Sequence, residues 1–267
     1  MEKRDILPII FDVCHKEGWT VEKNYKRENW KADVIVSYSN YKVAFNIGKR
    51  FNTVEESYLA MRKERVCGCW LALSYESRPF CNEDLACFYL DESDGKYSVK
   101  FNSSYYIDIE NFVSLLVRGK ITRAKTIQPK FVDIYLIQNK CYRCGAIDNV
   151  YFVKRMMTKD GVILSAGEDF GRDIHFNPIL VRLVQKHIEE HPELGVTIGV
   201  IKPRYSKTME ESYMSFGCSK CDSIVGDFFL KELIFDCIYD ESMNNIVRID
   251  TEASVLSFPV HHWHIAK

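Results

Sequence analysis

The stretch WKADVIVSYSNYKVAFNIGKR, residues 30–50, decides how the first half of this chain folds. ADVIV (32–36) is a short run rich in β-branched residues, SYSNY provides a polar turn, and KVAFNI (42–47) alternates apolar and polar residues. Strand alternation places the three large apolar side chains of KVAFNI on one face and Asn46 on the other. The stretch therefore predicts a β-hairpin with Asp33 on its first strand and Asn46 on its second.

The segments around this hairpin predict a mixed α/β domain. Residues 4–17 space their apolar side chains as a helix does, and GWTVEKNY is extended in character. TVEE (53–56) has the capping-box pattern, in which the threonine caps a helix and the last glutamate reaches back. CWLAL (69–73) is again an apolar strand. The order helix, three strands, helix, strand is typical of a sheet to which a helix returns the chain.

Two further segments extend this domain. Residues 74–107 suggest two strands around the turn DESDG, and DIENFVSLLVRG (108–119) has the pattern of a capped amphipathic helix. A basic stripe follows, which we define as Arg118, Lys120, Arg123, Lys125 and Lys130. No acid lies between Asn111 and Val132. The stripe predicts either contacts to nucleic-acid phosphates or a solvated linker.

Composition and charge limit the classes of protein to be considered. The 267 residues are 46% hydrophobic and 27% charged, as in globular proteins of one large domain or two ordinary ones. No apolar run approaches the roughly 20 residues of a membrane span, and the amino-terminal segment carries acids among its apolar residues, unlike a secretion signal. We therefore expect a cytoplasmic protein with no membrane partner.

The net charge of −1 gives no global positive field to attract nucleic acid, but the charge is unevenly distributed. Residues 1–130 carry 21 Lys and Arg against 18 Asp and Glu, whereas residues 131–267 carry 15 against 19. We place the domain boundary near residue 130, where the basic stripe ends. The first domain is then 1–130 and the second 131–267.

Two cysteine pairs in the second domain form the strongest motif. CYRCG holds Cys141 and Cys144, and CSKCD holds Cys218 and Cys221. Two such knuckles supply four thiolates for a tetrahedral zinc ion at ~2.3 Å, with no open position, so the zinc would be structural. Four unrelated buried thiols are the alternative, and a redox pair lacks the strand-then-helix context that it requires.

The spacing of the two pairs predicts a clamp around a small folded module. The 73 residues between them include the strand VYFVK (150–154) and a helix at 177–191, with Asn177 as its cap and Pro192 after its end. Closing so long a loop is entropically costly without a cross-link. The other six cysteines are expected to be packing residues: Cys14, Cys67, Cys69, Cys81, Cys87 and Cys237. HHWHIAK, at the end of the sequence, is expected to form a terminal strand or tail.

Asp33 and Asn46 also stand where a metal-dependent nuclease would carry ligands. Phosphodiester hydrolysis needs carboxylates that hold Mg²⁺ on adjacent strands, and a polar or basic group that orients water. Asn46 can ligate through its carbonyl oxygen but brings no charge. Lys49 would face away in an ideal strand, and only a bulge would turn it back. The alternative is an Asp and an Asn on an ordinary sheet.

The segment VEKNYKRENWKADVIV…KVAFNIGKRFNTVEESYLAMRKERVCGCWLAL resembles the nuclease-like domain of the competence protein CoiA-like family. The resemblance implies a PD-(D/E)XK restriction-endonuclease-like fold. Glu22 matches its early acid and Asp33 its metal-binding aspartate, whereas Asn46 replaces the second carboxylate and Gly48 replaces Gln or Lys. YSKTMEESYMSFGCSKCDSIVGDFFL is similar to the zinc-binding region beside such domains, which implies a zinc-ribbon-containing α/β module.

This resemblance implies a bacterial-type protein that processes nucleic acid, with DNA favoured over RNA. An active enzyme would be a Mg²⁺-dependent nuclease with an altered motif, in which Asp33 and Glu22 hold the ion, Asn46 completes its shell and Lys49 assists. The second hypothesis is a catalytically inert nuclease fold that binds nucleic acid or a protein partner. The third is a zinc-stabilised interaction protein, and a homodimer is compatible with each.

Overall fold

The computed structural model of this protein describes residues 1–74, 85–102, 105–159, 161–167, 170, 172–239 and 245–266, and the side chains of 172, 173 and 237–239 are not described. Within these residues the chain is mixed α/β, as predicted, and has five α-helices, none of which is long and apolar enough to cross a membrane. The chain forms two compact units: unit 1 is Met1–Ala124 with His261–Lys267, and unit 2 is Lys125–Val260.

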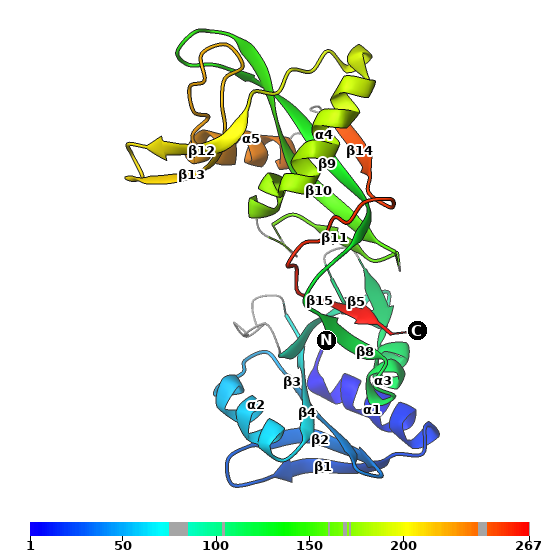
Figure 1. The fold of residues 1–267 in the computed structure, drawn as a ribbon. Helices are drawn as coiled ribbons and strands as arrows, with labels where there is room; N and C mark the ends of the chain where they lie inside the picture. The colour runs from blue at the N-terminus through cyan, green and yellow to red at the C-terminus, as the bar shows by residue number, and fades with distance from the viewer. Residues whose placement is uncertain are drawn as a thin grey trace. The chain divides into compact units, whose positions relative to one another are not determined.

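The division between the units differs from the boundary expected near residue 130. The chain leaves unit 1 after Ala124, and its last residues return to unit 1 instead of completing the second domain. The return has a structural cause: strand β15 (His262–Ile265) pairs antiparallel with β8 (Ile121–Ala124). HHWHIAK thus contributes a terminal strand, as expected (Figure 1).

Within the described residues, unit 1 is built on a seven-stranded sheet with the order β1-β2-β3-β4-β5-β6-β7. β4 pairs parallel with β3 and β5, and the other neighbours are antiparallel. The predicted order of helix, three strands, helix and strand is confirmed, as are two strands around the DESDG turn. The elements are α1 (Lys3–Lys16), β1 (Thr20–Lys26), β2 (Lys31–Tyr38), β3 (Tyr41–Gly48), α2 (Val54–Lys63), β4 (Val66–Ala72), β5 (Ala86–Ser93), β6 (Lys96–Lys100), β7 (Tyr106–Asp108) and α3 (Ile109–Val117).

The helix starts of unit 1 test two sequence predictions with opposite results. The carboxylate of Asp108 accepts hydrogen bonds from the amides of Glu110 at 2.9 Å and Asn111 at 3.2 Å, so the predicted cap of α3 is confirmed. The predicted capping box of α2 is wrong. Thr53 has a left-handed backbone with φ of 55°, and its hydroxyl donates to the carbonyl of Asn52 at 2.7 Å instead of capping the helix.

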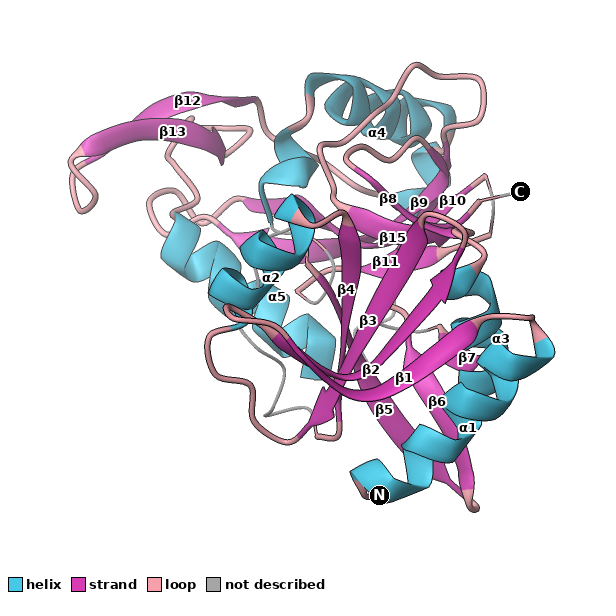
Figure 2. Cartoon of the chain, turned by 90° about the horizontal axis from the view of Figure 1, so that it is seen from below, coloured by secondary structure: helices cyan, strands magenta, loops and turns pink. Residues whose placement is uncertain are grey.

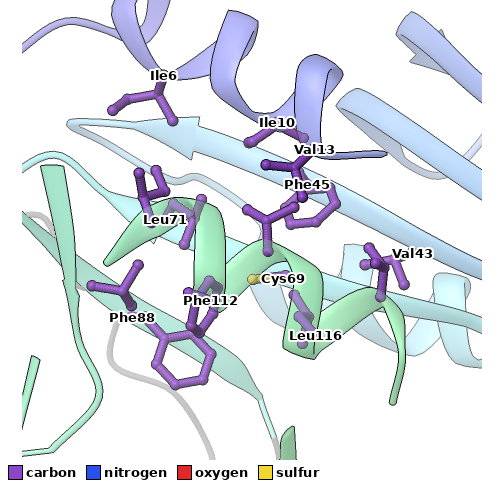
Figure 3. Packing of buried hydrophobic residues seen from close by; sticks show 14 of the residues in the cluster. Ile6, Ile10, Val13, Val43, Phe45, Cys69, Leu71, Phe88, Phe112 and Leu116 are labelled. Atoms are coloured by element: carbon purple, nitrogen blue, oxygen red, sulfur yellow. The ribbon is translucent and has the colours of Figure 1, made fainter. Parts of the chain in front are cut away.

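Helices cover both faces of this sheet (Figure 2). Val43, Phe45 and Ile47 point to one face, as their alternation predicts, and belong to the same buried cluster as residues of α1 and α3. Figure 3 shows Val43 and Phe45 in this cluster. Met61 of α2 packs on the opposite face with Trp70. Each large apolar side chain buried in this way stabilises the fold by about 1.5–3 kcal/mol.

Several of the cysteines expected to pack do so. Cys14, Cys69 and Cys87 are buried, and Cys67 is half-buried. Burial raises the pKa of the Cys14 thiol to about 12, with a smaller contribution from Glu17, so this thiol stays protonated and inert. Cys81 and the side chain of Cys237 lie outside the described residues.

Unit 2 contains, in its described part, a four-stranded antiparallel sheet with the order β11-β10-β9-β14 and a two-stranded sheet of β12 and β13. Leu180 and Val184 of α4 are fully buried in the core of this unit. The predicted cap of α4 is confirmed, because the side chain of Asn177 accepts from the amide of Ile179 at 2.9 Å. The elements are β9 (Pro129–Lys140), β10 (Ile147–Thr158), β11 (Ile163–Ser165), a 3₁₀ turn (Arg172–Phe176), α4 (Pro178–Glu190), a second 3₁₀ turn (Pro192–Leu194), β12 (Ile201–Ser206), β13 (Glu211–Phe216), α5 (Asp227–Tyr239) and β14 (Ile246–Asp250).

Candidate functional site

The four cysteines of the C-x-x-C motifs meet at one place in unit 2. Cys141 and Cys144 lie in the turn between β9 and β10, and Cys218 and Cys221 lie between β13 and α5. Their Sγ atoms all lie within 4.8 Å of one another, with 3.6 Å from Cys141 to Cys221 and 3.5 Å from Cys144 to Cys218. Sulfurs about 2.3 Å from a tetrahedral ion are about 3.8 Å apart. The cluster can therefore hold a metal ion such as zinc.

The two C-x-x-C turns repeat the same backbone hydrogen bonds. In each, the amide of the first cysteine donates to the carbonyl five residues later, at 2.8 Å for Cys141 and 2.9 Å for Cys218. The carbonyl of that cysteine accepts, at 2.9 Å in both turns, from the amide four residues later. The residue donating that bond has a left-handed backbone, with φ of 71° at Gly145 and 56° at Asp222. This conformation explains why glycine or a small polar residue follows each pair.

Hydrogen bonds around the cluster favour the thiolate, which is the form that binds metal. Hydrogen bonds from the side chain and backbone of Ser223 lower the pKa of Cys221 to about 6, and the backbone of Cys144 lowers the pKa of Cys141. A backbone hydrogen bond from Cys221 lowers the pKa of Cys218, but burial and the neighbouring thiols raise it to about 12. Four converging thiolates repel one another, so full ionisation of the cluster requires a cation.

Polar contacts fix the second turn against the rest of unit 2. The buried carboxylate of Asp148 accepts from the backbone amide of Ser219 at 3.1 Å and from its hydroxyl. Asp222 forms ion pairs with Arg204 and, at 2.6 Å, with Lys202, both on β12. These contacts orient the second pair of cysteines independently of a metal.

Asp33 and Asn46 line a common cleft of about 650 Å³ in unit 1. Val34 of β2 pairs with Phe45 of β3; Asp33 precedes the first of these residues and Asn46 follows the second. Because the strands are antiparallel, Asp33 and Asn46 stand opposite each other and point to the same face of the sheet. Glu22 and Lys49 are exposed and do not line this cleft. The structure thus brings together two of the four predicted catalytic residues.

Both carboxylate oxygens of Asp33 already have partners. Oδ2 accepts from the backbone amide of Ile47 at 2.8 Å, and Oδ1 pairs with the ammonium group of Lys3. The Asp33 side chain is 21% exposed and that of Lys3 is 42% exposed, so the carboxylate is the more buried partner of this ion pair. Sequence reasoning missed Lys3, and no local pattern connects the start of α1 with a residue in β2.

Basic side chains outnumber acids around this cleft. Lys3, Lys26, Arg27, Lys31 and Arg50 line it, against Glu28 and Asp33. Arg27 lies 3.6 Å from Glu64, whereas Lys26, Lys31 and Arg50 form no ion pair within the described part of the chain.

Aromatic side chains form part of the cleft wall. Tyr25 and Phe51 are half-buried there, and Trp30 and Trp70 are buried behind them. Trp30 lies 5.3 Å from Tyr25 between ring centroids and donates a hydrogen bond to Glu64 at 2.9 Å. The ring of Tyr25 therefore packs against a tryptophan that a hydrogen bond holds in place.

The basic stripe is partly engaged in contacts within the chain. Arg118 ends α3 and donates to the carboxylate of Glu17 at 2.8 Å through Nε. Arg123 lies in β8, half-buried, with its guanidinium 5.6 Å from the ring centroid of Trp263. Lys120 and Lys125 are exposed. Arg118 therefore belongs to a helix end and Arg123 to a strand, so the stripe is not a linker along its whole length.

A comparison with known proteins finds no family model and no curated protein that matches this chain. The resemblance to the CoiA-like family and the nuclease function that it implies therefore stay predictions. Among the described residues, the four cysteines are the one group of three or more His, Cys, Asp and Glu side chains gathered closely enough to hold a metal. Asp33 belongs to no such group, so the described geometry does not support a Mg²⁺ site.

Proposed function

We propose that this protein binds nucleic acid in the Asp33 cleft without hydrolysing it, and that a structural zinc ion in the cysteine cluster holds unit 2 together. DNA is the favoured ligand because of the CoiA-like resemblance. The single observation that carries the proposal is the Asp33 carboxylate, occupied by Lys3 and the Ile47 amide inside a cleft where cations predominate.

The topology of unit 1 supports a PD-(D/E)XK-like core. The order α1-β1-β2-β3-α2-β4, with an antiparallel meander followed by a strand parallel to β3, is the arrangement expected for that fold. By the CoiA-like resemblance, Asp33 and Asn46 match the positions at which such a fold carries its metal ligands. The proposal therefore places the ligand at the position of a nuclease substrate.

The residues present favour binding over hydrolysis. A hard divalent cation prefers several carboxylate oxygens, whereas Asn46 is neutral and the Asp33 carboxylate is paired with an ammonium group. The Nδ2 atom of Asn46 is buried and has no hydrogen-bond partner among the described residues. Glu22 and Lys49, which hydrolysis would require, do not reach the cleft lining.

The chemistry of the cleft suits a single-stranded nucleic acid. Lys26, Lys31 and Arg50 would neutralise phosphates, which makes the affinity strongly dependent on salt. Tyr25 and Phe51 offer half-buried rings on which bases can stack, an interaction worth about 1–3 kcal/mol per base. Stacking tolerates any base, so we expect weak sequence preference.

A matched pair of double variants tests the binding site. Lys26→Gln with Arg50→Gln removes two cleft cations, whereas Lys63→Gln with Arg65→Gln removes two exposed cations that do not line the cleft. In fluorescence anisotropy with a labelled 20-nucleotide strand, the first variant should flatten the slope of log affinity against log salt by about 0.7 per lost contact. Equal effects of both variants would contradict the cleft as the binding site.

A nuclease assay with Mg²⁺ or Mn²⁺ tests the absence of hydrolysis. The wild-type chain should leave single- and double-stranded DNA intact, and Mg²⁺-dependent cleavage abolished by Asp33→Ala would establish an active nuclease instead. Asn46→Glu with Gly48→Lys restores the family pattern. A Cβ at Gly48 would meet its nearest atom at 3.5 Å, an ordinary contact, so the second substitution is sterically allowed. Cleavage gained by this variant alone would support the inert-scaffold proposal.

A further inference from the structure

The four-stranded sheet of unit 2 carries a second cationic group, centred on Asp133. This aspartate is 1% exposed, and its carboxylate accepts hydrogen bonds from two arginines on the neighbouring strands. The Nε atom of Arg155 donates at 2.7 Å to Oδ2. Arg248 donates from Nε at 2.7 Å to Oδ1 and from Nη2 at 3.0 Å to Oδ2. One buried acid thus orients two guanidinium groups.

Strand register places these residues in one row across the sheet. Arg155 of β10 and Arg248 of β14 both stand opposite Asp133 of β9. The β9–β10 register shifts between Val153 and Arg155, and this bulge adds Lys154 to the strand beside the row. Bulges commonly re-aim side chains next to functional sites.

The free ends of both arginines are exposed to solvent. The Arg155 and Arg248 side chains are 41% and 55% exposed, although each is bound to the buried acid. Because Nε takes part in both contacts, the Nη groups of Arg155 and Nη1 of Arg248 are left for another ligand within the described structure. A guanidinium fixed on one edge presents its remaining donors in a rigid fork.

Aromatic rings hold the cations of this group in place. The guanidinium of Arg248 lies 3.7 Å from the ring centroid of Phe131, and the ammonium of Lys154 lies 4.7 Å from that of Tyr135. Cation–π contacts at such distances are worth about 0.5–1 kcal/mol at exposed sites. The cations therefore lose little conformational entropy when they bind an anion.

The charge of the row exceeds what a structural ion pair needs. One arginine would neutralise Asp133, so the second leaves a positive charge, to which Lys154 adds another. Asp250, two residues after Arg248 on β14, is the nearest acid along that strand, and its carboxylate accepts from the Glu252 amide at 2.8 Å. The row remains cationic with this acid included.

We infer that Arg155 and Arg248, with Lys154, form a binding site for phosphate groups of a nucleic-acid strand, independent of the cleft in unit 1. The arginine forks match the geometry of a phosphate, and they approach it from two adjacent strands. Phe131 and Tyr135 are covered by the cations, so this sheet contacts the backbone of the strand and not its bases. Binding here is therefore insensitive to sequence.

Single substitutions test this site without leaving Asp133 unpaired. Arg155→Gln and Arg248→Gln each remove one fork while the other arginine still pairs with the buried acid. Each should flatten the slope of log affinity against log salt for a labelled 20-nucleotide oligothymidylate by about 0.7. Arg182→Gln, an exposed arginine of α4, is the matched control and should leave the slope unchanged. Equal slopes for all three variants and wild type would overturn the inference.

Two further measurements separate this site from the cleft and from a general charge effect. In the Lys26→Gln, Arg50→Gln background, the oligonucleotide should still protect β9, β10 and β14 from hydrogen exchange, and protection confined to unit 1 would overturn the inference. Arg155→Lys with Arg248→Lys keeps the charge and the pairing to Asp133 but removes the forks. We expect a severalfold loss of affinity for the oligonucleotide. Unchanged affinity would overturn the role of the guanidinium forks, because charge alone would then explain the binding.

Discussion

The cysteine cluster of unit 2 and the Asp33 cleft of unit 1 were both predicted from short motifs, but the structure completes them to different degrees. All four cysteines converge, whereas the cleft gathers Asp33 and Asn46 without Glu22 and Lys49. A C-x-x-C turn carries its own backbone geometry, so its two ligands are placed locally. A carboxylate site needs residues from several strands, and its geometry depends on the whole sheet.

The two regions also differ in how their charges are balanced. The sulfurs lie 3.6 Å apart in the pair Cys141–Cys221 and 3.5 Å apart in the pair Cys144–Cys218, and no charge of a Lys or Arg contributes to the shifted pKa values of Cys141, Cys218 and Cys221. Asp33, by contrast, is neutralised within the protein by Lys3. We therefore expect unit 2 to depend on a cation and unit 1 to fold and bind without one.

Removing the metal should have the largest effect. The protein should contain one zinc per chain, and Cys221→Ser or a strong chelator should lower the free energy of unfolding of unit 2 by on the order of 5 kcal/mol, because metal binding is coupled to folding. Calorimetry with metal analysis measures both quantities. Cys67→Ser, in unit 1, should keep the zinc; a metal-free wild type with full stability would contradict the clamp.

A core substitution in unit 1 provides the complementary result. Leu71 is fully buried between the sheet and the helices α1 and α3. Leu71→Ala should destabilise unit 1 by about 3 kcal/mol through lost burial and a residual cavity. Chelation should add nothing to this loss in the unit 1 transition. If chelator lowers both calorimetric transitions equally, the two units do not differ in metal dependence.

The sequence predicted elements that depend on neighbouring residues. Alternation in β3 placed Val43, Phe45 and Ile47 on the core face, and Asp108 and Asn177 cap helices as expected. These features are set within a few residues of the chain, where local hydrogen bonds and side-chain direction decide the conformation.

Features that depend on distant contacts could not be predicted in this way. The pairing of β15 with β8 joins the last strand of the chain to a strand near its middle, so the last residues belong to unit 1. The partner of Asp33 comes from α1 and not from the hairpin. Thr53 fits a capping pattern, but its left-handed backbone turns the hydroxyl away from the helix.

Substitution of Asp133 should have a smaller effect on the free energy of unfolding, and this effect should depend on pH. Burial alone would raise the pKa of this carboxyl, but hydrogen bonds from Arg248 and Arg155 lower it below its usual range. Asp133→Asn should cost about 2 kcal/mol, below the range for fully buried pairs because the arginines are half-exposed. A carboxyl with a lowered folded pKa contributes stability that is complete above its unfolded pKa of about 3.9 and is lost as the pH falls through its folded pKa.

Denaturant titrations of wild type and Asp133→Asn at several pH values measure this contribution. The difference in unfolding free energy between the two proteins should be constant from about pH 5 to 7 and shrink below about pH 4. Comparing the two proteins at each pH cancels the effect of acid on the cysteine cluster, which is common to both. A difference that grows with acid would contradict the role of the Asp133 carboxylate.

The smallest effect should come from Asp33, and its sign distinguishes the two regions most directly. Asp33→Asn removes a negative charge from a cationic cleft, and the new amide oxygen can still accept from the Ile47 amide. Oligonucleotide affinity should rise about threefold, or ~0.7 kcal/mol, with or without Mg²⁺. Glu28→Gln is the matched control, since it removes the other acid of the cleft and should act in the same direction. If Mg²⁺ strengthens binding in wild type and Asp33→Asn abolishes that gain, Asp33 is a metal ligand. The cleft would then depend on a bound cation, as the cysteine cluster is expected to do.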